Sequence, residues 1–365
     1  MRSLGSTVAR LGALRRASKA AIVNTASRLT DLTGFGSNPG ALVGRCYFPD
    51  HLEPGAPLIV VLHGCTQNAA VYDRGSGWSK LADRHGFAVL FPEQTRANNA
   101  NLCFNWYSAS DSRRGRGEAA SIAQMVRHVT AKHGLDPART YINGLSAGGA
   151  MTAVMLACYP ELFAGGAIIA GLPFGVAEGV PEALERMRGQ GMPSRAALAS
   201  RIANAADHGG PWPTLSVWHG TADSTVSIAN ADLIVDQWRD RIGLSDAQGR
   251  TDTVDGQRRT TWRDSAGGVM IERYDIAGMG HGTPLGTRGD AACGQPGAHM
   301  LEAGICSTGR IAASWGLTKG AARVEASHRP APAAKRAPRR RAAVPVARGV
   351  GAVIEDALRA AGLMR

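Results

Sequence analysis

The sequence lacks any apolar run long enough to cross a membrane, since no stretch approaches the roughly 20 apolar residues that a bilayer requires. The longest purely apolar run near its amino end, Ala20 to Val23, is shorter than the roughly 7–15 residues at the centre of a secretory signal. Its six cysteines include no Cys-x-x-Cys pair, which argues against a zinc knuckle or a dithiol redox motif. We therefore expect no membrane span, no export signal, no metal and no cofactor.

Acidic residues are scarce at both ends, and this accounts for the basic composition. The first 28 residues hold six Lys or Arg and no acid, and residues 319–365 hold eleven Lys or Arg and three acids. Subtracting +6 and +8 from the formal charge of +12 leaves −2 for residues 29–318. The body is thus close to neutral, so composition gives no reason to expect a specific nucleic-acid partner.

The two basic ends suggest extensions outside the folded domain. Residues 1–28 contain a short helical pattern that fits either a surface-seeking helix or a packed terminal helix. Residues 319–349, rich in Ala, Pro and Arg, are predicted to be a disordered linker. Residues 350–365 have the spacing of a short amphipathic helix. Together the linker and helix suggest attachment to an anionic or apolar surface or to a partner; the alternative is a solvated tail with a frayed helix.

The body, residues 29–318, alternates strand and helix patterns. Apolar runs such as Pro57 to Leu62 are typical of strands buried on both faces. Strands that alternate with helices predict an α/β fold with a mostly parallel sheet covered on both faces. The sequence places the last strand at 269–276. Further strands are predicted at 87–91, 140–143, 164–170 and 215–218, and helices at 79–85, 118–133, 150–158 and 228–242.

Two segments depart from this alternation. Residues 171–213 carry Gly and Pro around two helical pieces, and fit either a cap beside the active site or a surface excursion. The polar loop 96–110 follows a predicted strand and is rich in Asn and aromatic residues. Its Asn105 and Trp106 are the candidate substrate-binding residues.

The strongest functional signal is Gly144-Leu145-Ser146-Ala147-Gly148. It lies between a predicted strand and a run of helix formers, the setting that a nucleophile elbow requires. Small residues on either side of the serine allow the strand and helix backbones to approach closely. The pattern predicts Ser146 as a catalytic nucleophile.

A serine nucleophile requires a base and a carboxylate that orients the base. Asp223 follows the predicted strand 215–218, and His281 follows the predicted strand 269–276. In the α/β-hydrolase class the order is Ser, acid, His, with each residue on a loop after a strand. We therefore predict Asp223 as the orienting acid and His281 as the general base; the alternatives are a loop-capping Asp and a surface His.

The oxyanion of the tetrahedral intermediate requires backbone N–H donors. The sequence predicts the N–H groups of Ala147, after the nucleophile, and of Cys65, in the turn His63-Gly64-Cys65 after an early strand. A rival arrangement uses Cys65 and His63 as a cysteine hydrolase, but it lacks an elbow. We also hypothesise a disulfide between Cys65 and Cys103, since both flank loops at the carboxyl ends of strands, and a second between Cys293 and Cys306.

The chain resembles the esterase and polyhydroxybutyrate (PHB) depolymerase family over roughly residues 28–317. The blocks that carry the resemblance include LHGCTQNA (62–69), FPEQ (91–94), YINGLSAGGAM (141–151), HGTADSTV (219–226) and GMGHGTP (278–284). The resemblance implies an α/β-hydrolase fold and hydrolysis of short-chain polyhydroxyalkanoate esters. The family's triad falls on Ser146, Asp223 and His281.

Several points remain open. Feruloyl and acetylxylan esterases share much of the pattern, so a carbohydrate ester is the alternative substrate. A non-catalytic surface-binding protein that works through its basic ends is the alternative of another class. The family implies an extracellular location, whereas the lack of an evident export signal fits a cytoplasmic or granule-associated one.

Overall fold

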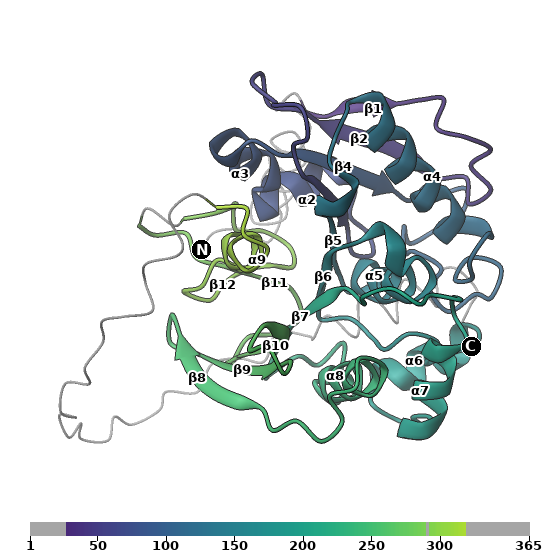
Figure 1. Ribbon diagram of the computed structural model, residues 1–365, viewed down its shortest axis with the longest axis vertical. Helices are drawn as coiled ribbons and strands as arrows, with labels where there is room; N and C mark the ends of the chain where they lie inside the picture. Colours follow the sequence, from purple (N-terminus) through teal and green to yellow (C-terminus); the bar gives the residue numbers. More distant parts are fainter. Residues whose placement is uncertain (1–26, 290–291, 319–365) are drawn as a thin grey trace, which may run out of the picture.

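A ten-stranded sheet forms the centre of the molecule (Figure 1). The computed structural model describes residues 27–289 and 292–318, and the predictions for residues 1–26 and 319–365 lie outside this part. The strand order is β1-β2-β4-β3-β5-β6-β7-β10-β9-β8. The strands are β1 (Thr30–Leu32), β2 (Val43–Tyr47), β3 (Leu58–Leu62), β4 (Ala88–Glu93), β5 (Thr140–Leu145), β6 (Gly165–Ile169), β7 (Thr214–Gly220), β8 (Arg250–Val254), β9 (Gln257–Arg263) and β10 (Val269–Ile276).

The six central strands, β4, β3, β5, β6, β7 and β10, run parallel, and antiparallel strands complete both edges. The predicted mostly parallel sheet is therefore confirmed. Strand β3 shows why these segments are continuously apolar. Its Leu58, Val60 and Leu62 belong to one hydrophobic core, and Ile59 and Val61 belong to another on the opposite face. A strand buried on both faces favours apolar side chains at most of its positions.

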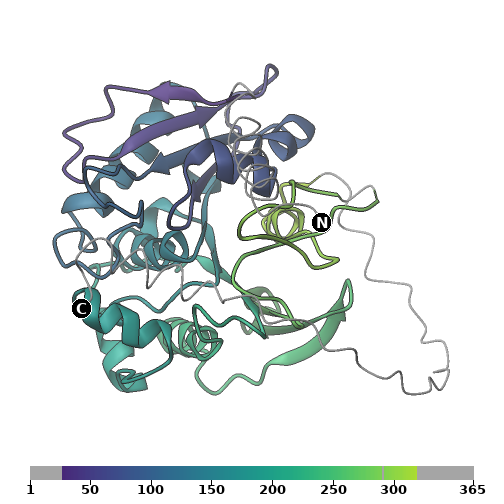
Figure 2. The same cartoon turned by 180° about the vertical axis from the view of Figure 1, so that it is seen from behind.

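Helices cover both faces of the sheet (Figures 1 and 2). Side chains of α4, α5, α7 and α8 fill one core, and those of α2, α3 and α9 fill the other. The helices are α2 (Ala69–Ser76), α3 (Trp78–His85), α4 (Gly117–Lys132), α5 (Ala147–Cys158), α6 (Val180–Met187), α7 (Arg195–Ala203), α8 (Ala229–Arg241) and α9 (Ser307–Ser314). Two short 3-10 turns, Pro137–Arg139 and Pro160–Leu162, precede β5 and β6. Among the described helices, none combines the length and apolar character that spanning a bilayer requires.

The structure corrects the expectation that β10 is the last strand. The short parallel pair β11 (Thr283–Leu285) and β12 (Met300–Glu302) follows it and forms a second sheet. Three-residue strands are too short to produce a periodic pattern, which explains why the sequence did not indicate them. Both new strands follow the predicted base His281 in the chain, so they belong to the region that carries it.

The segment 171–213 contains α6 and α7, close to the two helical pieces expected there. Helix α7 contributes the buried side chains Leu198 and Ile202 to the core that α8 also fills. Helix α6 instead lines a cavity that also contains Ser146. The segment therefore borders this cavity, and its role as a cap stays a prediction.

Candidate active site

Ser146 lies at a sharp turn between β5, which ends at Leu145, and α5, which begins at Ala147. Its φ is +57° and its ψ is −118°, a region that residues with a side chain rarely occupy. The Ser146 N–H donates to the carbonyl of Ile169 on β6 at 2.9 Å, and the Ser146 carbonyl accepts from Ala150 at 2.8 Å. The neighbouring strand and helix thus hold Ser146 in a backbone conformation that would otherwise be unfavourable.

The two glycines of the elbow permit a close approach of backbones. A Cβ on Gly144 would lie 2.3 Å from the carbonyl oxygen of Gly148. A Cβ on Gly148 would lie 2.4 Å from the carbonyl oxygen of Leu62 and 2.5 Å from that of His63. Neither position accepts a larger residue without moving backbone. These contacts bring the first turn of α5 against β5 and the end of β3, where the predicted oxyanion turn begins.

The structure brings Asp223 and His281 together from the loops after β7 and β10. Nδ1 of His281 lies 2.7 Å from Oδ2 of Asp223, so a protonated Nδ1 donates to the carboxylate. Nε2 of His281 has no hydrogen-bond partner within the described chain, and His281 lines the same cavity as Ser146. The Ser146 hydroxyl likewise makes no hydrogen bond to a described residue. The arrangement leaves one imidazole nitrogen available to exchange a proton in the cavity.

The Asp223 side chain is fully buried and accepts several hydrogen bonds. Its Oδ1 accepts from the N–H groups of Thr225 and Val226 at 2.8 and 2.9 Å. His219 on β7 is also buried, with Nε2 3.4 Å from Oδ2 of Asp223 and 2.8 Å from the Val226 carbonyl. Burial opposes ionisation of Asp223, but the hydrogen bonds from His219 and His281 outweigh it and hold its pKa below the ordinary value. Asp223 is therefore a carboxylate under ordinary conditions.

The turn after β3 contains Cys65, which forms a disulfide with Cys103. Cys293 and Cys306 form a second disulfide, so both hypothesised pairings are confirmed. A disulfide-bonded Cys65 has no thiolate, and this excludes the rival cysteine hydrolase built on it. Of the remaining two cysteines, Cys46 and Cys158 are free, and burial raises the pKa of each thiol to about 12.

His63, the partner of Cys65 in the excluded rival, is buried and orders the turn. Its Nδ1–H donates to the Gly64 carbonyl at 2.8 Å, and its Nε2 accepts from the Gln94 N–H at 3.1 Å. Burial lowers its pKa to about 4, so the ring is neutral near pH 7. The N–H groups of Cys65 and Ala147, the predicted oxyanion donors, bind no acceptor within the described residues, and both residues line the cavity. Ala147 begins α5, where the helix dipole favours negative charge.

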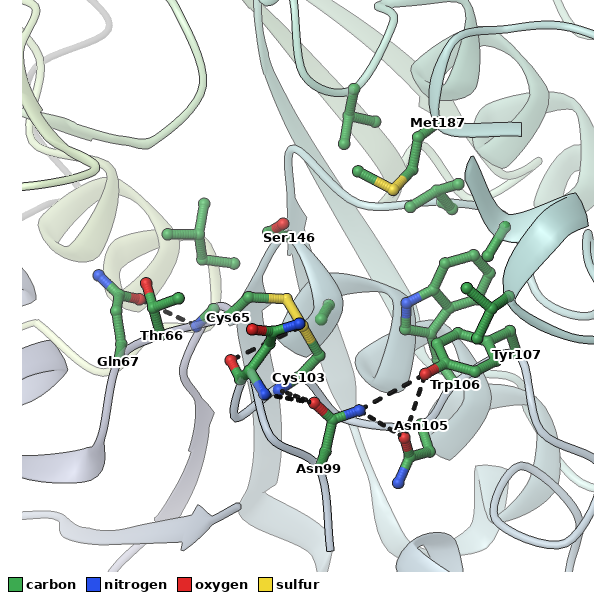
Figure 3. Close-up of a pocket in the computed structure, with 18 of the residues that line it drawn as sticks. Cys65, Thr66, Gln67, Asn99, Cys103, Asn105, Trp106, Tyr107, Ser146 and Met187 are labelled. Carbon is green, nitrogen blue, oxygen red and sulfur yellow. Dashed lines mark hydrogen bonds between the residues drawn. A yellow bond between two sulfur atoms is a disulfide. The ribbon is translucent and has the colours of Figure 1, made fainter. Parts of the chain in front are cut away.

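The cavity that holds these residues has a volume of about 420 Å³ and no charged Asp, Glu, Lys or Arg in its wall. Figure 3 shows Thr66 and Gln67 on one side of Ser146, with the rings of Trp106 and Tyr107 on the other. Apolar side chains of α6 complete the wall; they are Val180, Ala183, Leu184 and Met187. Its size is typical of small-molecule sites, and its lining suits an uncharged ligand.

Asn105 and Trp106 both line this cavity, as the sequence suggested. The Asn105 amide is occupied by protein partners: its Oδ1 accepts from Asn99, and its Nδ2 donates to Glu118 Oε1 at 2.7 Å. Trp106 packs edge-on against Tyr107. These contacts fix the shape of the wall on the side of loop 96–110.

Sequence reasoning missed Glu118, His219 and His299. Glu118, on α4, is fully buried. Burial raises its pKa to about 7, although the hydrogen bonds that it accepts from Asn105 and Gln94 act in the opposite direction. His299 lines the cavity, and its Nδ1–H donates to the His281 carbonyl at 3.2 Å. Within the described residues, no group of three or more His, Cys, Asp or Glu side chains is arranged to hold a metal ion.

One of these three had a usable signal. Glu118 lies four residues before Ile122, on the face of the predicted helix that carries apolar side chains. An acid on an apolar helix face indicates a buried carboxylate with dedicated partners. His299 lies in an irregular loop where no periodicity applies, and His219 ends a buried strand, so neither stood out from the other histidines.

Comparisons with known proteins identify related esterases and depolymerases. A family model described as Esterase PHB depolymerase matches residues 46–261. The chain is 43% identical over 293 residues to poly(3-hydroxyalkanoate) depolymerase C of Paucimonas lemoignei, covering 79% of this chain and 70% of that protein. It is 32% identical over 268 residues to feruloyl esterase B of Talaromyces funiculosus, covering 71% and 74%. Among solved structures, an acetyl xylan esterase from Aspergillus awamori superposes with a TM-score of 0.62 at 26% identity, covering 69% of this chain and 93% of that one.

Proposed function

The chain belongs to the esterase and PHB depolymerase family of α/β-hydrolases and is a carboxylic ester hydrolase; from this premise we propose that it cleaves short-chain polyhydroxyalkanoates with Ser146, His281 and Asp223 as its catalytic triad. The observation that carries the proposal is the cavity beside Ser146, which is uncharged and of small-molecule size. The 43% identity to a polyhydroxyalkanoate depolymerase supports the substrate class.

In the acylation step, the Ser146 hydroxyl oxygen attacks the ester carbonyl while Nε2 of His281 takes the hydroxyl proton. Asp223 holds Nδ1 of His281 at 2.7 Å, so the lone pair of the neutral ring lies on Nε2. The imidazolium that forms is stabilised by the carboxylate, whose pKa stays below its ordinary value. His281 then returns the proton to the leaving alkoxide, and the alcohol departs from the acyl-enzyme.

In the deacylation step, water replaces the serine hydroxyl as the nucleophile. Nε2 of His281 takes a proton from the water as its oxygen attacks the acyl carbon, and then gives a proton to the Ser146 oxygen as the acyl bond breaks. The products are a carboxylic acid and the free enzyme. In both steps the N–H groups of Cys65 and Ala147 receive the negative charge that develops on the carbonyl oxygen.

The wall of the cavity supports an uncharged aliphatic ester. A short polyester chain carries neutral ester groups that gain nothing from a cationic or anionic wall, and its methyl branches pack favourably on apolar side chains. Met187 and Leu184 of α6 provide such a surface. Trp106 adds a flat apolar face, while the bound amide of Asn105 holds the wall in place.

A carbohydrate esterase that removes feruloyl or acetyl groups is the second candidate. It is favoured by the 32% identity to a feruloyl esterase and by the fold shared with an acetyl xylan esterase. The same triad serves both candidates, so they differ only in the alcohol and acyl groups that the cavity accepts. A non-catalytic role as a surface-binding protein has no observation in its favour.

We also propose that residues 29–318 form the catalytic domain and that residues 319–365 promote contact with an ester-polymer granule. The support is the +8 charge of this segment against the near-neutral body. Tethering to a surface raises the local substrate concentration without altering the chemistry. Deleting residues 319–365 is expected to leave turnover of a soluble p-nitrophenyl ester unchanged and to weaken granule binding. Equal granule binding at every salt concentration would remove the tail from the proposal.

A substrate panel on the purified chain tests the proposed function. It comprises p-nitrophenyl butyrate, amorphous PHB, feruloylated xylan and acetylated xylan, with Ser146→Ala as the blank for each. We expect serine-dependent release of 3-hydroxybutyrate products from the polymer. Preference for either xylan ester over the polymer would select the carbohydrate esterase instead.

A further inference from the structure

Glu118 is a fully buried carboxylate that takes no part in the proposed chemistry. Within the described residues it forms no ion pair with a Lys, Arg or His. Four N–H groups converge on it instead: Nε2 of Gln94 at 2.6 Å, Nδ2 of Asn98 at 3.1 Å, and both Nδ2 and the backbone N–H of Asn105, at 2.7 and 2.8 Å. A buried carboxylate without a counter-ion is costly, and proteins retain such groups where another role requires them.

The four donors lie along the segment that forms one wall of the cavity. Asn98 and Asn105 line the cavity directly. Gln94 is the first residue of the segment and follows β4 directly. Because all four groups donate, only an acceptor on Glu118 satisfies them together. Gly40 packs against the backbone of Glu118, since a Cβ at Gly40 would lie 2.4 Å from the Glu118 Cα and N, and the Gly40 carbonyl accepts from Asn98. Segment 94–107 is thus folded around the Glu118 side chain.

The same segment is joined to the predicted oxyanion turn at three points. The Cys103–Cys65 disulfide is one, and it is visible in Figure 3 below Ser146. The second is the Thr66 N–H, which donates to the Asn101 carbonyl at 2.7 Å. The third is the Gln94 N–H, which donates to Nε2 of His63. Any shift of segment 94–107 is therefore passed to the turn that carries the Cys65 N–H.

Backbone conformation at this junction shows that the turn needs support. Thr66 has φ of +64° and Leu102 has φ of +55°, both in a region that non-glycine residues seldom adopt. Such conformations persist only where contacts with the surrounding structure hold them in place. The Cys65–Cys103 disulfide and the Thr66–Asn101 hydrogen bond act directly at this junction, and the hydrogen bonds to Glu118 hold the segment on either side of Leu102.

We propose that Glu118 is a positioning residue, whose buried carboxylate fixes segment 94–107 and, through it, the oxyanion turn and the aromatic wall of the cavity. The inference rests on the proposed function in so far as that turn supplies an oxyanion donor. Glu118 itself does not line the cavity, so its effect on catalysis is indirect. It acts through Gln94, Asn98 and Asn105.

The test compares Glu118→Gln with Glu272→Gln in the full chain. Glu272 on β10 is likewise a buried glutamate that accepts from a hydroxyl, Ser216 Oγ at 2.8 Å, and it lies outside the cavity wall. Glutamine at 118 keeps one acceptor oxygen and sets an NH₂ group against the remaining N–H donors. We expect kcat for p-nitrophenyl butyrate to fall by on the order of 10², the scale of a displacement near 1 Å, with a smaller change in KM. Glu272→Gln is expected to retain the parent kcat.

A second variant covers the case in which Glu118→Gln does not fold. Gln94→Met removes one donor to Glu118 without touching the cavity, and it is expected to lower kcat in the same direction. The double variant Glu118→Gln/Asn105→Asp reverses one donor–acceptor pair and is expected to recover part of the kcat that Glu118→Gln loses. Parent-like kcat in folded Glu118→Gln, or in Gln94→Met where the first variant fails to fold, overturns the proposal.

Hydrogen exchange gives a readout that does not depend on catalysis. Glu118→Gln is expected to speed amide exchange in peptides that contain Thr66 and Asn105, and Glu272→Gln is not. If the parent chain shows no Ser146-dependent esterase activity, the proposed function fails while this exchange result still decides the role of Glu118. Unchanged exchange in both peptides would contradict the positioning role.

Discussion

Two buried carboxylates lie near the candidate site, Asp223 and Glu118, and they differ in the groups that donate hydrogen bonds to them. Asp223 faces the imidazoles of His219 and His281, groups that can carry positive charge. Within the described part of the chain, the Glu118 carboxylate accepts hydrogen bonds only from neutral amide groups of Gln94, Asn98 and Asn105. The pKa of Asp223 is held below its ordinary value, whereas burial raises that of Glu118 to about 7.

The difference in donors and in pKa matches the proposed role of each carboxylate: Asp223 supports the catalytic base, and Glu118 supports the oxyanion turn. His281 gains and loses a proton in the proposed cycle, so its partner must remain charged and stabilise the imidazolium. The oxyanion turn only has to keep backbone N–H groups in place, and neutral hydrogen bonds suffice for that. The serine between them depends on neither carboxylate for its position, because backbone contacts of Gly144 and Gly148 fix the elbow. The predictions below separate these three kinds of support.

The largest effect is expected from Ser146→Ala, because it removes the hydroxyl oxygen that is the proposed nucleophile. Loss of a triad nucleophile costs on the order of 10⁶ in kcat. The strained turn remains sterically accessible to alanine, so the fold should be retained, which circular dichroism would verify. Turnover of p-nitrophenyl butyrate within about tenfold of the parent would show that another residue is the nucleophile.

Asp223→Asn is expected to reduce kcat by about 10⁴, because the amide no longer selects the tautomer of His281 that leaves Nε2 unprotonated. This loss exceeds the one expected for Glu118→Gln, since Asp223 contacts the catalytic base directly. Steady-state kinetics on one soluble ester measures both variants. Equal losses of kcat in the two variants would contradict the distinction between Asp223, which stabilises the charged imidazolium, and Glu118, which holds the oxyanion turn in place.

The two disulfides allow a test of the oxyanion turn, because only Cys65–Cys103 lies in that turn and Cys293–Cys306 serves as its control. Replacing Cys65 and Cys103 by alanine should destabilise the fold by about 2–4 kcal/mol and also lower kcat, because the oxyanion turn loses one of its ties. Replacing Cys293 and Cys306, whose loop carries His299, should cost a similar free energy of unfolding and lower kcat less, because this disulfide has no direct tie to the oxyanion turn. Denaturant unfolding and ester kinetics on both double variants make the comparison. A parent-like kcat in the first double variant would show that this disulfide has no part in holding the turn.

The smallest expected effect is on stability, and it has opposite signs at the two carboxylates. Because the folded pKa of Asp223 lies below its ordinary 3.8, its contribution is present above that pH and is lost as pH falls further. Because the folded pKa of Glu118 is raised from 4.5 to about 7, the folded state holds its proton longer, and stability falls as pH rises through this range. Denaturant unfolding at several pH values, with Asp223→Asn and Glu118→Gln as references, measures both slopes. Slopes of the same sign would contradict this electrostatic comparison.

Sequence reasoning predicted the central strands because each is a continuous apolar run, as in Leu58–Leu62. It missed the hairpin of β8 and β9, whose charged and exposed residues hide their strand character. The turn between them, Asp255-Gly256, has φ of +47° and +78° and is a sequence signal that was available.

The residues of the candidate site likewise fall into those that the sequence predicted and those that it missed. Ser146, Asp223 and His281 each follow a strand that apolar patterning reveals, so their order along the chain predicts that they meet. Glu118 and His299 contribute through contacts between segments that are distant in sequence, such as Glu118 with Asn98 and His299 with His281. Only the folded structure brings these partners together.

The most direct test of the account is covalent labelling of the full chain with a fluorophosphonate, followed by peptide mass spectrometry. A serine hydrolase reacts at its activated serine, so the account predicts a single adduct on Ser146. The adduct should be absent in Ser146→Ala and should form more slowly in Asp223→Asn, while Glu272→Gln reacts at the parent rate. An adduct on a different residue, or equal labelling of the parent and Asp223→Asn, would contradict the assignment of Ser146 as a nucleophile activated by His281 and Asp223.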